Sequence, residues 1–203
     1  MLDHAFLAAV EVLRQSFDEA MLDRQVGEER FQADLLGGDL TWETSYALPG
    51  EGKPPRVRAD VTLDWPTWSQ TAYRSWQLEG DVDEPPELGI EVVLRVQHLA
   101  STPDLEVIRH VLDEDGPALG GERLVRTSPT VEQAFDEDLT GVGWAVEFAY
   151  DGSYEFGEAV LRDLGRLQAV LGGIGTWAAS ALVRLGDLRL AFRPPEDVEG
   201  GGV

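Results

Sequence analysis

The stretch Arg56–Gly80, RVRADVTLDWPTWSQTAYRSWQLEG, decides the fold, because two alternating runs meet in it at Trp65-Pro66-Thr67-Trp68. Side chains point to opposite faces along a strand, so a period of two marks one apolar and one polar face. We therefore predict that both runs are strands and that Pro66-Thr67 is the loop of an antiparallel hairpin at the centre of a sheet. Because Pro-Thr does not supply the positive φ angles of the favoured two-residue turns, a longer loop around a type I turn is the alternative.

This pairing gives the hairpin an aromatic, mostly apolar face that also carries Gln70 and Arg74. A core position is the ordinary interpretation of its tryptophans, because they share that face with valine and leucine. The alternative is a surface for a partner or ligand, since aromatic and arginine side chains anchor many interfaces. The residues of that predicted surface are Trp65, Trp68, Arg74 and Trp76.

The same two periodicities predict the elements on either side of this stretch. We expect helices from residue 3 to about 27, from 101 to about 113–116, and over 158–171. We expect hairpins around Gly37-Gly38 and around Asp151-Gly152, and single strands over 89–100 and 122–127. Residues 128–138 are predicted to be irregular or a single helical turn, and 176–185 to be a strand rather than a helix.

These elements predict an α+β fold with a mostly antiparallel meander sheet and about three helices packed on one of its faces. A chain of 203 residues is long enough for one sizeable core. We predict a single domain over residues 1–193 and a disordered tail over 194–203.

Charge and cysteine content limit the function classes. Aspartate and glutamate outnumber lysine and arginine by 38 to 16, which gives a net charge of −22. Binding to nucleic acid or to an anionic membrane depends on cationic side chains, so we expect neither, and a basic protein partner or a cation is the more natural ligand. There is no cysteine, which excludes disulfides and thiolate chemistry. The first residues contain no basic leader, and we expect a cytoplasmic protein.

One acidic segment resembles the last part of a calcium-binding loop. Asp113, Asp115 and Glu122 stand at ligand spacing around Gly116, but Val111 occupies the position of the first ligand. An acidic turn at the surface is therefore the preferred interpretation, with no cofactor, and calcium at Asp113, Asp115 and Glu122 is the alternative.

Histidine is the remaining candidate for catalysis. His98 is predicted to end a strand and His110 to lie on the following helix, so the two approach each other if that helix folds back over the sheet. Neither belongs to a zinc-binding H-E-x-x-H motif or accompanies a serine of the G-x-S-x-G type.

Two functions follow. The preferred one is a non-enzymatic binding, adaptor or chaperone-like protein that presents an acidic surface to a protein partner and that is compatible with a homodimer. The acidic runs 81–91 and 132–138 are solvated loops in the ordinary interpretation, and docking segments for a basic partner in the functional one. The alternative is an enzyme or small-ligand binder with a pocket between sheet and helix, using His98 or His110, carboxylates and a divalent cation.

Overall fold

The computed structural model describes residues 4–25, 27–33, 38–80, 84–135 and 142–193. Within these ranges the strands form one antiparallel sheet in the order β1-β3-β4-β5-β9-β7-β6, with β2 paired to β3 and β8 paired to β9. The predicted α+β class and antiparallel sheet are confirmed. The predicted tail, 194–203, lies outside the described residues.

The strands at the margins of the sheet are short, and those at its centre are long. They are β1 (Asp23–Arg24), β2 (Arg30–Ala33), β3 (Leu40–Ala47), β4 (Val57–Trp65), β5 (Glu87–Leu99), β6 (Asp115–Leu119), β7 (Glu122–Arg126), β8 (Thr130–Phe135) and β9 (Val142–Glu155). The helices are α1 (His4–Glu19), α2 (Thr67–Glu79), α3 (Leu105–His110), α4 (Glu158–Arg162), the 3-10 turn η1 (Leu164–Arg166), α5 (Leu167–Leu171) and α6 (Ile174–Gly186).

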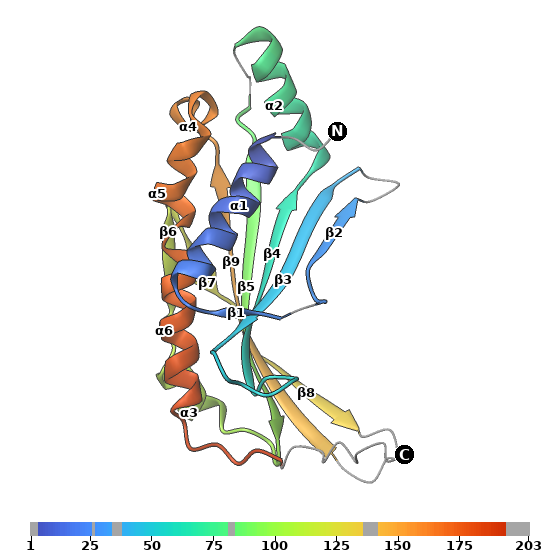
Figure 1. Ribbon diagram of the computed structural model, residues 1–203, viewed down its shortest axis with the longest axis vertical. Coiled ribbons are helices and arrows are strands. Elements are labelled where there is room, and N and C mark those ends of the chain that lie inside the picture. Colours follow the sequence, from blue (N-terminus) through green and yellow to red (C-terminus); the bar gives the residue numbers. More distant parts are fainter. Residues whose placement is uncertain (1–3, 26, 34–37, 81–83, 136–141, 194–203) are drawn as a thin grey trace.

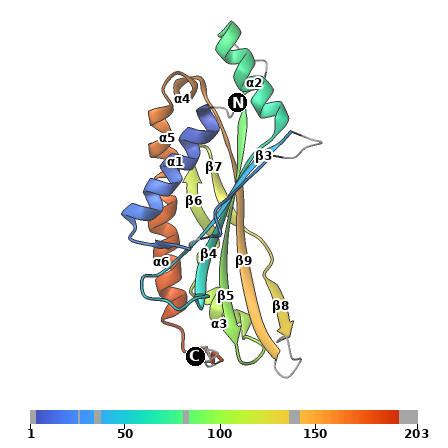
Figure 2. The same cartoon turned by 45° about the vertical axis from the view of Figure 1, so that its right-hand side comes forward.

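The helices lie on one side of the sheet. Figures 1 and 2 show α1, α5 and α6 against the same face, while α2 extends beyond one end of the strands. Within the described ranges, no helix lies over the opposite face (Figure 2). The sheet is therefore half of a two-layer arrangement with one side left open.

The two faces are already visible in β4. Its alternate residues Val57, Ala59, Val61, Leu63 and Trp65 are buried under the helices, as their spacing predicts. The residues between them are half-buried or exposed on the opposite face. The predicted strand over 57–65 is confirmed, but its partners are β3 and β5.

The second half of the predicted hairpin is wrong, because residues 67–79 form helix α2. Asp39, which lies just before β3, accepts hydrogen bonds at one oxygen from the Thr67 backbone N–H (2.7 Å) and the Thr67 hydroxyl (2.9 Å). This carboxylate caps the first turn from 28 residues away. Gly80, with φ 78°, ends the helix and donates to the Trp76 carbonyl. Gln70 and Arg74 consequently lie on a helix and not on the sheet.

The predicted turn at Asp151-Gly152 is also wrong, because β9 continues through it as one strand of 14 residues. Asp151 and Gly152 pair in register with Glu91 and Ile90. A Cβ on Gly152 would lie 3.0 Å from the Arg123 carbonyl oxygen and 3.1 Å from the Leu124 side chain. The glycine therefore serves close packing against β7 rather than a turn.

Residues 176–185 belong to helix α6 and not to the predicted strand. The helix packs on α1 and reaches β4 and β5. By length and composition alone the run Leu164–Gly186 is apolar enough to span a membrane, a test that core helices of soluble proteins also pass. The predicted helix over 158–171 is broken by η1, where the Asp163 side chain accepts from the Gly165 N–H.

Helices α1 and α6 meet at a very short distance. The Ser16 hydroxyl donates to the Gly172 carbonyl oxygen and accepts from the Gly175 N–H, both at 2.8 Å. A Cβ on Gly175 would lie 2.2 Å from the Ser16 carbonyl oxygen, so no side chain fits there. This contact joins segments 159 residues apart.

Two smaller differences concern the region between β5 and β9. Helix α3 is shorter than predicted and is capped by Asp104, which accepts from the Glu106 N–H at 3.1 Å. Residues 130–135, predicted to be irregular or a helical turn, form strand β8 on β9.

Candidate partner-binding face

The helix-free face of the sheet is organised in rows of side chains that run across the strands. Cross-strand partners point to the same side of a sheet, so the register identifies each row. Three successive rows contain five carboxylates on the central strands β4, β5 and β9, and we call these residues the acidic rows. They are Asp64, Glu87, Glu91, Asp151 and Glu155.

The acidic rows place like charges directly opposite each other. Glu87 pairs with Glu155, and Glu91 pairs with Asp151, across β5 and β9. Within these rows β4, β5 and β9 carry no arginine or lysine. Arg30 on β2 lies at one margin of the same face, and Arg123 lies on β7 beside β9, two residues from the Val125 that pairs with Asp151. The centre of the face therefore lacks a compensating cation from its own strands.

The pKa of Glu91 is shifted by its position in the acidic rows. Burial raises the pKa of its carboxyl above the ordinary value of 4.5, and the charge and hydrogen bond of Asp151 raise that pKa further. Asp64 and Glu147 add smaller effects of the same sign. The charged form of Glu91 is thus disfavoured by its surroundings.

The neighbouring part of the same face is neutralised. Arg95 forms ion pairs with Glu132 (2.8 Å) and with Glu147, and Arg58 pairs with Glu28 (3.2 Å) and Asp60 (3.0 Å). Burial raises the pKa of Asp60, against the hydrogen bond from Ser45 and the charge of Arg58. Arginine side chains of the sheet therefore form ion pairs with the carboxylates in this half of the face, whereas the same strands carry no arginine within the acidic rows.

A hollow of about 420 Å³ adjoins the acidic rows at the foot of α2. Three carboxylates and the Trp68 side chain, which is 42% exposed, take part in its wall. The lining residues are Asp39, Thr41, Asp64, Pro66, Trp68, Glu87 and Gly89. Asp39 already caps α2, and Asp64 accepts from the Thr41 hydroxyl at 2.8 Å. An exposed indole beside carboxylates is a suitable environment for an organic cation.

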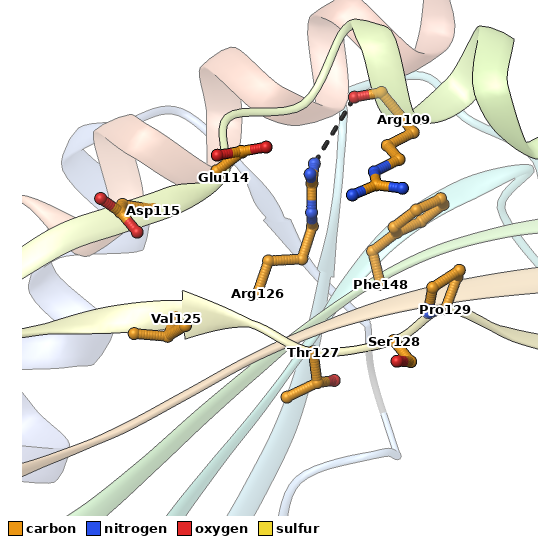
Figure 3. A pocket seen from close by; sticks show the side chains of 9 residues that line it. All are labelled: Arg109, Glu114, Asp115, Val125, Arg126, Thr127, Ser128, Pro129 and Phe148. Atoms are coloured by element: carbon orange, nitrogen blue, oxygen red, sulfur yellow. Dashed lines mark hydrogen bonds between the residues drawn. The ribbon is translucent and has the colours of Figure 1, made fainter.

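A second hollow, of about 340 Å³, lies between α3 and the strands β6 and β7 (Figure 3). The Arg126 side chain points from β7 towards α3 and donates to the carbonyls of Leu112 (3.1 Å) and Arg109 (3.5 Å). Arg109 stands beside the Phe148 ring in Figure 3. Glu114 and Asp115 also line this hollow, so it carries two groups of each charge and favours no ligand charge.

The residues of the predicted calcium loop are spread along a β-hairpin. Asp113 pairs with Arg184 at 2.7 Å, Asp115 begins β6, and Glu122 begins β7. Asp115 pairs with Val125 while Glu122 pairs with Leu119, which puts them at opposite ends of the hairpin. In the part of the chain that the structure describes, no group of three His, Asp or Glu side chains is arranged to hold a metal ion. Calcium binding itself stays a prediction.

The histidines of the enzyme alternative stand at the ends of two elements, β5 and α3. His98 occupies the bulge of β5, with φ 60°, and its carbonyl accepts from the Arg193 N–H at 2.8 Å. His110 ends α3 and is exposed. Neither side chain lines either hollow.

The four residues of the predicted aromatic surface are divided between core and surface. Trp65 is buried, with edge contacts to Tyr73 and Phe156. Trp76 is half-buried and stacks on Tyr73, while Arg74 lies on the exposed side of α2 and donates to Gln70. Of the four, Trp68 alone lines a hollow described above.

The acidic rows were predicted only in part from the sequence. Glu87 and Glu91 belong to the acidic run 81–91 that was considered for docking, whereas Asp64, Asp151 and Glu155 belong to neither acidic run. Residues 81–83 and 136–138 of the two runs lie outside the described residues. The signal was present as acidic residues at even spacing, E-L-G-I-E at 87–91 and D-G-S-Y-E at 151–155. Their significance depends on the pairing of β5 with β9, and the predicted turn at Asp151-Gly152 concealed that pairing.

Comparison with family models, with curated proteins and with solved structures gives no match to this chain.

Proposed function

We propose that this chain is a non-enzymatic protein-binding module, of the adaptor or chaperone-like kind, whose protein partner docks on the helix-free face of the sheet. The observation that carries the proposal is the open second face of a large sheet whose other face is packed under helices. A sheet of this width usually has both faces covered, or it has one face of mixed polar side chains in contact with water. Here the open face has a concentrated charge and an adjoining hollow with an exposed tryptophan.

The enzyme alternative has less support. A catalytic histidine needs a partner group and a place for the reacting atoms. Both hollows contain carboxylates, but neither is lined by His98 or His110.

Affinity capture with a blocked face tests the proposal. Thr62 lies on β4 between Glu43 and Glu91 on the open face, and Thr62→Trp places a large neutral side chain there. Thr176→Trp is the matched control, because Thr176 is exposed on α6 on the helix side. Tagged forms of the full chain are used to capture proteins from the source organism, followed by mass spectrometry.

We expect proteins that are retained by the unmodified chain and by Thr176→Trp but lost from Thr62→Trp. Circular dichroism spectra of all three forms establish that each is folded. Capture of the same proteins by all three forms, or of none by any of them, contradicts the proposal.

A further inference from the structure

We infer that the partner of the open face is a basic protein segment in extended conformation, which lies along β5 and β9 with its lysine or arginine side chains on the acidic rows. The inference rests on the proposed function and names the chemistry of the partner. Its first support is charge complementarity: the five carboxylates of the acidic rows face no arginine or lysine from their own three strands.

The second support is that the fold retains an unfavourable arrangement. Like charges directly opposite on an antiparallel pair destabilise a sheet, and β5 and β9 hold two such pairs on this face. They are Glu87–Glu155 and Glu91–Asp151, on either side of the uncharged Gly89–Ser153 pair. In the other half of the face the sheet supplies Arg58 and Arg95 to its carboxylates. Features that lower stability without a local benefit are typical of binding sites. A cationic partner relieves this repulsion.

The third support is spacing. Alternate side chains of an extended chain are about 6.8 Å apart, which is also the distance between successive rows along a strand. The acidic rows extend over roughly 10 Å across three strands and roughly 13 Å along them. A single divalent cation needs its oxygen ligands within about 2.6 Å of one point, so it does not fit this spread. Several cationic side chains on one extended segment do.

The hollow at Trp68 provides an end point for such a segment. Asp64 and Glu87 belong both to the acidic rows and to the wall of the hollow, so the two surfaces are continuous. A guanidinium or ammonium group that enters the hollow meets these carboxylates and the exposed face of the Trp68 indole. One cationic side chain of the segment is therefore placed at Trp68.

A defined peptide tests this inference. The probe is a fluorescein-labelled peptide of about 14 residues in which arginine alternates with serine, and its control has glutamine at every arginine position. Binding to the full chain is measured by fluorescence anisotropy at about 0.05 M and about 0.5 M salt. The row variant is Glu91→Gln with Asp151→Asn. Its matched control is Glu11→Gln with Asp18→Asn, which removes the same charges from exposed positions on α1, on the helix side.

We expect the arginine peptide alone to bind, with a Kd about tenfold weaker for the row variant and changed less than about twofold for the α1 control. Trp68→Ala is expected to weaken binding about fivefold, whereas Leu78→Ala, at a side chain that is 86% exposed on the same helix, leaves it unchanged. Binding is expected to weaken more than tenfold at the higher salt concentration.

Three results would overturn the inference. They are equal weakening by the row variant and the α1 control, binding that is insensitive to salt, and displacement of the peptide by millimolar Ca²⁺ or Mg²⁺. If the peptide fails in this way while Thr62→Trp still loses its captured proteins, the proposed function stands and the basic partner is wrong. If neither experiment gives its expected result, both are wrong.

Discussion

Substitution of Gly175 by alanine tests the contact that holds the helix layer together. The added Cβ would lie 2.2 Å from the Ser16 carbonyl oxygen, whereas ordinary contacts begin at 3.4 Å. Helices α1 and α6 must therefore separate by about 1 Å, and overpacking of this kind costs about 1–3 kcal/mol. The separation also lengthens the two hydrogen bonds of the Ser16 hydroxyl, each worth about 1 kcal/mol.

The expected loss for Gly175→Ala is about 4 kcal/mol in the free energy of unfolding. For a chain of this size that loss lowers Tm by about 10 °C. Urea titration followed by circular dichroism measures the first quantity, and thermal unfolding measures the second. Ser16→Ala, which leaves the Gly172 carbonyl and the Gly175 N–H without the hydroxyl, is expected to cost about 1–3 kcal/mol.

Gly173→Ala is the matched control, two residues away. Gly173 has helical φ and ψ angles of −81° and −14°, and nothing lies within 4 Å of an added Cβ. Its substitution is expected to leave stability unchanged or raise it by about 0.5 kcal/mol, since alanine restricts the unfolded chain. The reasoning is refuted if Gly175→Ala stays within about 1 kcal/mol of the unmodified protein, or if Gly173→Ala is equally damaging.

Three further predictions concern the sheet and α2. Gly152→Ala is expected to destabilise the protein by about 1–3 kcal/mol, and Gly121→Ala, where an added Cβ meets nothing within 4 Å, by much less; urea titration compares them. Asp39→Ala removes the cap of α2 and is expected to cost about 1 kcal/mol, with faster amide hydrogen exchange in its first turn; unchanged exchange contradicts the cap. Because the folded-state pKa of Glu91 is raised, its charged form lowers stability above that pKa, and this penalty is lost as pH falls through it. Glu91→Gln is therefore expected to be more stable than the unmodified protein at pH 7, with an advantage that disappears at acidic pH; a constant or reversed difference refutes the assignment.

The strands were predictable where apolar and polar side chains alternate along the strand, because the apolar side chains then all point to the face that the helices cover. Val57 to Trp65 is the plain case, because five apolar residues at even spacing are all buried. The strand at 40–47 was predicted for the same reason, and it pairs with β4. The strand predicted over 89–100 corresponds to β5 (Glu87–Leu99), which lies between β4 and β9 near the centre of the sheet.

The wrong elements depend on contacts from distant residues. Residues 67–79 alternate well enough to be a strand, but the cap of the helix they form comes from Asp39. Asp151-Gly152 has the composition of a tight turn, and only the approach of Arg123 and Leu124 explains why a glycine is needed inside a strand. Local sequence carries no information on either contact.

The candidate site was hidden for the same reason. Each of its carboxylates is an ordinary exposed or half-buried residue of its own strand. They become a site because β4, β5 and β9 are adjacent, and strand order is a property of the folded chain.

The contact between Ser16 and Gly175 also has a consequence for biosynthesis. Its partners are separated by 159 residues, so at about 5–20 residues per second the ribosome adds the second partner roughly 8–32 s after the first. During that interval the apolar stripe of α1, which includes Phe6, Val10, Leu13 and Phe17, has no α6 to pack against. A nascent chain that stalls or is cut before residue 174 lacks the part of this packing that α6 supplies, while Phe17 still has Tyr46 of β3 to stack on.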